Sequence, residues 1–145
     1  MKQLLSPYII STLVLLLATT RVQAQGITGT WYNEEKTAKI QIYEAKDDRY
    51  YGKIVWLREP NENGRPKTDK NNPDKSKKSS PLMNLLVLRG FTKKSATSFE
   101  GGTIYDPKNG KTYDCKMTLK GDQLDIRGYV GISLLGRTST WTRTQ

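Results

Sequence analysis

The sequence predicts an all-β domain, a small antiparallel up-and-down β-barrel of about eight or nine strands. The clearest signal lies in residues 101–130, where three alternating segments are separated by two short turns. From Tyr113 to Leu119, apolar residues alternate with polar ones, which is the period of a strand with one buried face. Similar short segments, bounded by Gly, Pro, Asn or Asp, recur along the chain. Closing such a sheet into a barrel removes its unpaired edges.

The other strands are expected before and after this region. In chain order they are Gly29–Tyr32, Thr37–Glu44, Tyr50–Leu57, Ser95–Glu100 and Gly131–Arg143. The segment Tyr50–Leu57 is apolar on both faces, which is typical of a strand that meets neighbours on both sides. Leu82–Phe91 is also apolar, and its length fits either a short helical turn or a strand.

Residues 58–81 interrupt the strand pattern with prolines, asparagines and charged residues. Seven basic and four acidic side chains make this segment mildly basic. Connections this long are uncommon inside one domain, and we expect a surface loop that caps one end of the barrel. Asp69–Asp74 is similar to a calcium loop, but Pro73 and Ser80 stand where ligands are required, so no metal site is expected.

Residues 1–24 have the features of a secretory signal peptide. A basic residue precedes the apolar run Tyr8–Ala18, and small residues lead up to a cleavage site after Ala24. The alternative is an uncleaved membrane anchor, but the run is shorter than the roughly 20 apolar residues that a spanning helix requires. We therefore expect an exported protein, periplasmic or secreted, with a single domain over residues 25–145.

The chain is strongly basic, with a net charge of +10 that falls to +8 when residues 1–24 are removed. Nucleic acid is a common partner of basic proteins, but an exported protein seldom meets it, so no nucleic-acid partner is expected. Anionic envelope surfaces and small acidic ligands are the candidate partners. The alternative is that the exposed lysines serve solubility. The sequence carries no signal for an oligomeric state.

The chain has no histidine and one cysteine, Cys115. Histidine is the commonest general base and a common metal ligand, so we expect no metal and no cofactor. Cys115 shares the apolar face of its strand with Tyr113 and Met117. This position favours a buried packing residue over a nucleophile.

The G-x-W motif at Gly29 and Trp31, together with Arg143 on the last strand, resembles the lipocalin signature. In that superfamily the tryptophan closes the bottom of the barrel, and a late arginine packs across it. An indole face beside a guanidinium group is a favourable pair. Arg137 occupies the same face of the last strand as Arg143 and is an alternative partner for the tryptophan.

Several ordered blocks of sequence resemble the bacterial exported family catalogued as domain of unknown function 2147. These blocks are residues 52–57, 102–107, 110–113, 127–131, 136–138 and 141–143. The resemblance covers nearly the whole of the mature chain and implies a lipocalin-like β-barrel that bacteria export, without an established activity. Phe99 departs from the family pattern, which usually has tryptophan there, and both residues are large aromatic fillers.

The leading functional hypothesis is a barrel that binds a small apolar, amphipathic or acidic ligand, or a component of the cell envelope. Its candidate binding residues are Tyr105, Tyr113, Arg127, Tyr129, Arg137 and Trp141. Arginines among aromatic residues suit an acidic head group. The alternative is that these side chains are barrel architecture. Strand parity also separates Arg127 and Tyr129 from the apolar face that Leu124 and Ile126 define.

Two other classes of function are weighed against binding. Without histidine, a hydrolase would need paired carboxylates or a Ser–Lys pair. The candidate carboxylates lie at turns or on solvent-facing positions: Asp106, Asp114, Asp122 and Asp125. We therefore expect a protein that is not an enzyme and has no catalytic residues. An envelope structural or interaction protein would use the 58–81 segment as its contact, through Lys75, Lys77 and Lys78.

Overall fold

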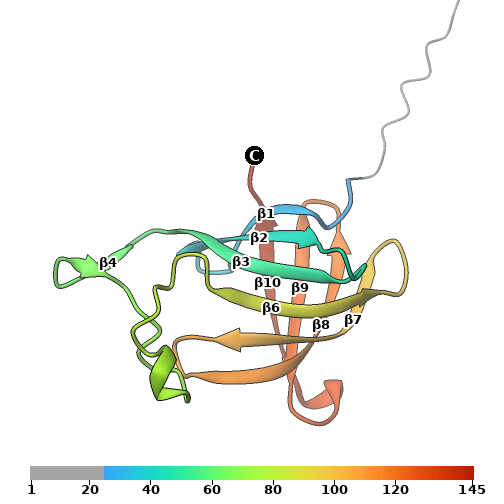
Figure 1. Ribbon diagram of the computed structural model, residues 1–145. Coiled ribbons are helices and arrows are strands. Elements are labelled where there is room, and N and C mark those ends of the chain that lie inside the picture. The colour runs from blue at the N-terminus through green and yellow to red at the C-terminus, as the bar shows by residue number, and fades with distance from the viewer. Residues whose placement is uncertain (1–24) are drawn as a thin grey trace, which may run out of the picture.

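Alternating apolar and polar residues build a closed antiparallel β-barrel in the computed structural model, which describes residues 25–145 (Figure 1). The barrel strands are β1 (Gly29–Tyr32), β2 (Ala38–Glu44), β3 (Tyr50–Leu57), β6 (Leu86–Lys93), β7 (Ser98–Asp106), β8 (Lys111–Lys120), β9 (Gln123–Tyr129) and β10 (Arg137–Arg143). Successive barrel strands pair with one another, and β1 pairs with β10 to close the barrel. The predicted up-and-down barrel is confirmed, with eight strands.

Four short elements lie in the connections between the barrel strands. The long connection from β3 to β6 contains the hairpin β4 (Asn61–Glu62) and β5 (Arg65–Pro66) and the 3₁₀ turn η1 (Lys75–Lys77). A second 3₁₀ turn, η2 (Ser133–Leu135), joins β9 to β10. The predicted signal peptide, residues 1–24, lies outside the described residues. Within residues 25–145, no helix has the length and apolar character needed to span a membrane.

Two details differ from the sequence-based expectation. Ser95–Glu100 is not a separate strand, because β7 continues through it to Asp106. The register of β7 against β8 shifts between Phe99 and Gly102, and Gly101 has a φ of 75°, a left-handed conformation that glycine adopts without strain. This irregularity interrupts the side-chain alternation. Residues 82–85 form a bend without a helix before β6 begins.

The barrel interior is filled at the end where β2 joins β3. Large side chains are completely buried there, including Phe91, Phe99 and Met117. Tyr50 meets Phe99 edge to face, with ring centroids 4.9 Å apart. Cys115 is also fully buried, and burial raises the pKa of its thiol to about 12, so the predicted packing role is confirmed.

Arg143 closes the filled end of the barrel by stacking on Trp31. Its guanidinium carbon lies 4.1 Å from the centroid of the Trp31 ring. The Nη1 and Nη2 groups donate to the carbonyl oxygens of Thr28 and Gly26, at 3.1 and 2.7 Å. Trp31 Nε1 donates to the Ile27 carbonyl at 2.9 Å, so the same pair holds the segment before β1.

Gly29 leaves room for this arrangement. Its φ of 129° is a backbone conformation that residues with a side chain rarely adopt, and a Cβ here would lie 3.2 Å from Arg143 Nη1. The other candidate partner of the tryptophan, Arg137, begins β10 and therefore lies at the opposite end of that strand.

We expect Arg143→Ala to lower the free energy of unfolding by about 2–4 kcal/mol, because two charged hydrogen bonds and the stack on Trp31 are lost. Urea denaturation followed by Trp fluorescence measures this change. Arg137→Ala is the matched control on the same strand, with an expected change below about 0.5 kcal/mol because this side chain is exposed. Equal losses in the two variants would contradict a closing role for Arg143.

Candidate ligand-binding site

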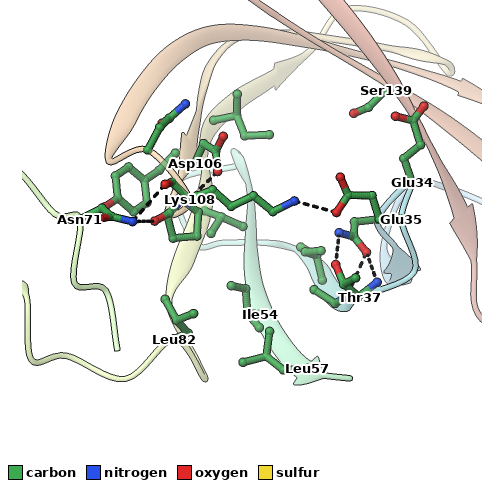
Figure 2. A pocket seen from close by; sticks show the side chains of 18 of the residues that line it. Glu34, Glu35, Thr37, Ile54, Leu57, Asn71, Leu82, Asp106, Lys108 and Ser139 are labelled. Carbon is green, nitrogen blue, oxygen red and sulfur yellow. Dashed lines mark hydrogen bonds and ion pairs between the residues drawn. The ribbon is translucent and has the colours of Figure 1, made fainter. Parts of the chain in front are cut away.

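A cavity of about 910 Å³ opens at the end of the barrel opposite the Trp31–Arg143 stack. Its walls come from inward positions on the strands, where aliphatic residues replace the large aromatic side chains of the filled end. The aliphatic residues are Ala38, Ile40, Ile54, Leu57, Val87, Ile104 and Ile126 on the strands and Leu82 just before β6, and Trp141 adds one aromatic ring. Figure 2 shows Ile54, Leu57 and Leu82 along one side of the cavity. A space of this size and apolar character is typical of small-molecule sites, which measure roughly 300–1,000 Å³.

Charged side chains surround the mouth of the cavity. The charged lining residues are Glu34, Glu35, Glu59, Glu62, Lys67, Lys70, Asp106, Lys108 and Arg137. Each of the three lysines pairs with a glutamate: Lys67 with Glu59, Lys70 with Glu62 and Lys108 with Glu35. Arg137 has no carboxylate within ion-pair distance among residues 25–145. Among the described residues it is the one lining cation without an ion-pair partner, and after Lys108 its charge contributes to the lowered pKa of Glu35.

Lys108 crosses the mouth to reach Glu35, as Figure 2 shows. The Nζ–Oε2 distance is 2.6 Å, and the pair joins the β7–β8 turn to the β1–β2 loop. Local hydrogen bonds fix the two loops that carry this pair. Asp106 Oδ1 accepts a hydrogen bond from the Lys108 backbone N–H, and Asn33 Oδ1 accepts one from the Thr37 backbone N–H. The Lys108 ammonium holds the pKa of the Glu35 carboxyl below its usual value through a hydrogen bond and charge attraction.

The long β3–β6 connection is anchored beside the mouth by a buried carboxylate. Asp69 is 1% exposed and accepts hydrogen bonds from Tyr105 Oη and Asn72 Nδ2, both at 2.7 Å. Burial of the phenol, together with the hydrogen bond to Asp69, raises the pKa of Tyr105 to about 12.

Asn71 attaches the same connection to the β7–β8 turn. Its Nδ2 donates to the carbonyls of Pro107 and Lys108, at 3.1 and 3.0 Å. The approach is close enough that a Cβ on Gly110 would lie 1.9 Å from the Asn71 carbonyl oxygen. The β3–β6 connection thus packs against the open end of the barrel, as expected of a cap. Its Asn71 side chain also holds the backbone of Lys108.

The structure brings four of the six candidate binding residues to the cavity. Tyr105, Tyr113, Arg137 and Trp141 line it. Arg127 and Tyr129 do not, because they occupy outward positions on β9, opposite in parity to the buried Ile126. Arg127 instead donates to the carbonyls of Ser133 and Leu134 and to Thr138 Oγ1, and so holds the β9–β10 loop.

Sequence reasoning missed the rest of the cavity lining. Strand parity identifies Ile40 and Ile54 as inward residues, but it does not separate a filled interior from a hollow one. Glu35 and Lys108 are 73 residues apart in adjoining turns, and no local pattern relates them. Within residues 25–145, no group of three or more His, Cys, Asp or Glu side chains is arranged to hold a metal ion.

A family model described as an uncharacterized protein conserved in bacteria, DUF2147, matches residues 29–143. The chain belongs to the DUF2147 family. The match begins at Gly29 and ends at Arg143, so it spans all eight barrel strands of the DUF2147 domain. A search of the curated proteins finds no match to this DUF2147 chain.

A solved structure is similar to the DUF2147 barrel. It is described as protein HP1028 from the human pathogen Helicobacter pylori, belonging to the lipocalin family. The two chains are 21% identical, with a TM-score of 0.72 over 81% of this chain and 82% of the other. At this identity the comparison shows the fold, and the lipocalin-like barrel expected from the G-x-W motif is confirmed.

We expect the Glu35 carboxyl of the DUF2147 chain to titrate below its ordinary pKa of 4.5, as measured by carboxyl-carbon NMR. Because the folded-state pKa is lowered, the bridge to Lys108 is fully formed above the ordinary value and is lost as the pH falls through the lowered one. In Lys108→Met the pKa of Glu35 should rise toward 4.5. The pKa of Asp125, which Lys120 lowers at the other end of the barrel, should stay unchanged and serves as the control.

We also expect Tyr105→Phe to lower the free energy of unfolding by about 1–3 kcal/mol, because a buried oxygen of Asp69 loses its donor. Thermal or urea unfolding measures the loss. Tyr51→Phe removes an exposed hydrogen bond to Asp47 and provides the control, with a change below about 0.5 kcal/mol. If the two variants lose the same stability, Asp69 does not anchor the connection through Tyr105.

Proposed function

We propose that this DUF2147 chain is a binding protein that holds one small amphipathic ligand, with its apolar part inside the barrel and an acidic group at the mouth. The observation that carries this proposal is the cavity of about 910 Å³, which has aliphatic walls and a charged rim. The proposal is for binding and not for catalysis. We further propose that the protein is exported and that residues 1–24 are cleaved as a signal peptide.

The apolar part of the ligand would lie against the walls formed by Ile40, Ile54, Ile104 and Ile126. Transfer of hydrocarbon from water to such walls contributes about 0.8 kcal/mol per methylene group. Eight-stranded barrels are just wide enough either to be filled by side chains or to hold one small ligand. In this barrel Phe91 and Phe99 help to fill one end, and the cavity lies at the other end.

Five carboxylates and four cations line the mouth, and their pairing leaves Arg137 as the cation proposed to meet an acidic head group. Glu35, Glu59 and Glu62 already have lysine partners, and Glu34 Oε1 accepts a hydrogen bond from the Thr140 backbone. Arg137 has no such partner within residues 25–145. A guanidinium group binds carboxylate or phosphate through two parallel hydrogen bonds, so Arg137 is the residue proposed to orient the ligand.

Native mass spectrometry of the protein, purified gently from its own cells, should detect a bound mass that disappears on denaturation. Titration with anilinonaphthalene sulfonate, an apolar ring system with one acidic group, provides a defined probe. Ser139 lines the cavity, and Ser139→Trp should fill the mouth and abolish both signals, whereas Ser139→Ala should retain them. Arg137→Ala should weaken the probe by about tenfold with little loss of stability. Unchanged binding in Ser139→Trp would overturn the proposal.

A further inference from the structure

The loop between β9 and β10 exposes an unusual group of aliphatic side chains. Val130, Ile132, Leu134 and Leu135 are 73%, 58%, 81% and 76% exposed. These four residues lie within seven consecutive positions of the chain, on the loop 130–136 that contains η2. In Figure 1 this loop projects from the barrel on the side away from the C-terminus. Contiguous exposed apolar residues at such a tip usually mark an interaction site.

Three N–H groups and four carbonyls of loop 130–136 have hydrogen-bond partners inside the protein. The carbonyls of Val130, Ile132 and Ser133 accept from the backbone N–H groups of Ile132, Leu135 and Gly136. Arg127 Nε and Nη2 donate to the carbonyls of Ser133 and Leu134, at 2.7 and 3.2 Å. These internal bonds reduce the number of backbone groups that must lose water when the loop enters a less polar environment.

Aromatic and cationic residues lie behind the apolar tip on the outer face of the sheet. Tyr129 directly precedes the loop, Arg127 stands two residues further back, and Lys116 is the register partner of Arg127 on β8. Asp114 faces Tyr129 across the same pair of strands. An apolar tip followed by a tyrosine and then by cations matches the layers of a membrane interface, where aromatic rings lie at the head groups and cations meet anionic lipid.

We propose that loop 130–136 inserts its four aliphatic side chains into the head-group region of an anionic lipid bilayer, as a peripheral membrane contact. A second copy or a protein partner fits less well, because a stable interface buries roughly 800 Å² on each side and this projecting loop is small. The 58–81 segment is also less suitable, since none of the exposed large apolar side chains of the described residues lies in it and three of its lysines pair with carboxylates.

This membrane contact would place the cavity mouth at the lipid surface. The β9–β10 loop and the mouth are at the same end of the up-and-down barrel, and Arg137, which follows the loop directly, lines the cavity. The inference rests on the loop and not on occupancy of the cavity. It therefore stands or falls separately from the proposed function.

Cosedimentation with vesicles of phosphatidylethanolamine and phosphatidylglycerol tests the proposal on the purified full protein. We expect binding that is weaker on phosphatidylcholine vesicles, and a loss of about tenfold or more in the double variant Leu134→Ser/Leu135→Ser. The triple variant Lys75→Gln/Lys77→Gln/Lys78→Gln is the matched control for the 58–81 segment and should bind within about threefold of the parent. Circular dichroism and thermal unfolding confirm that each variant is folded.

A second measurement reports insertion directly. In Leu134→Trp, fluorescence should shift to shorter wavelength on the anionic vesicles and be quenched by brominated lipid. Three outcomes would overturn the proposal: no vesicle binding by the parent protein, equal binding by the double leucine variant, or loss of binding in the lysine variant alone. If the parent protein forms a dimer and does not bind vesicles, and the double leucine variant is a monomer, the loop contacts a second copy of the chain and not a membrane.

Discussion

The stack of Arg143 on Trp31 is the interaction on which the arrangement of this barrel depends. Strands β1 and β10 pair over two residues, Trp31 with Arg143 and Tyr32 with Thr142, so the barrel is closed by a short seam. The guanidinium group reinforces that seam by binding the carbonyls of Gly26 and Thr28. Since this end is sealed by backbone contacts and filled by aromatic residues, the interior space is confined to the opposite end.

The open end is organised by polar contacts between loops that are distant in sequence. Asp69 and Asn71 attach the β3–β6 connection to β7 and to the turn that follows it, and Lys108 extends from that turn to Glu35. Buried or multiply bonded groups hold the frame, whereas the exposed Lys108–Glu35 pair contributes little to stability. The β3–β6 connection is thus held against the open end by Asp69 and Asn71, and the exposed Lys108–Glu35 pair spans the mouth.

The two faces of strand β9 belong to different surfaces of the protein, because alternate side chains point into and out of the barrel. Inward residues such as Ile126 line the cavity, while outward Arg127 and Tyr129 support the apolar loop 130–136. The six aromatic and basic residues singled out in the sequence are thus divided between two surfaces, with Tyr105, Tyr113, Arg137 and Trp141 at the cavity. Grouping these residues by chemical type merges the two surfaces, whereas the alternation along β9 already separates Arg127 and Tyr129 from the inward face in the sequence.

The sequence by itself determined the antiparallel barrel, the closing motif and the burial of Cys115, because alternation and turn residues are local properties of the chain. It did not determine the bulge at Gly101, which extends β7 past a break in the alternation. Tertiary structure alone decided that one end of the barrel is hollow, that Arg143 rather than Arg137 meets Trp31, and that Lys108 reaches Glu35. These outcomes depend on strand stagger and on contacts between residues far apart in the chain, which no short stretch of sequence specifies.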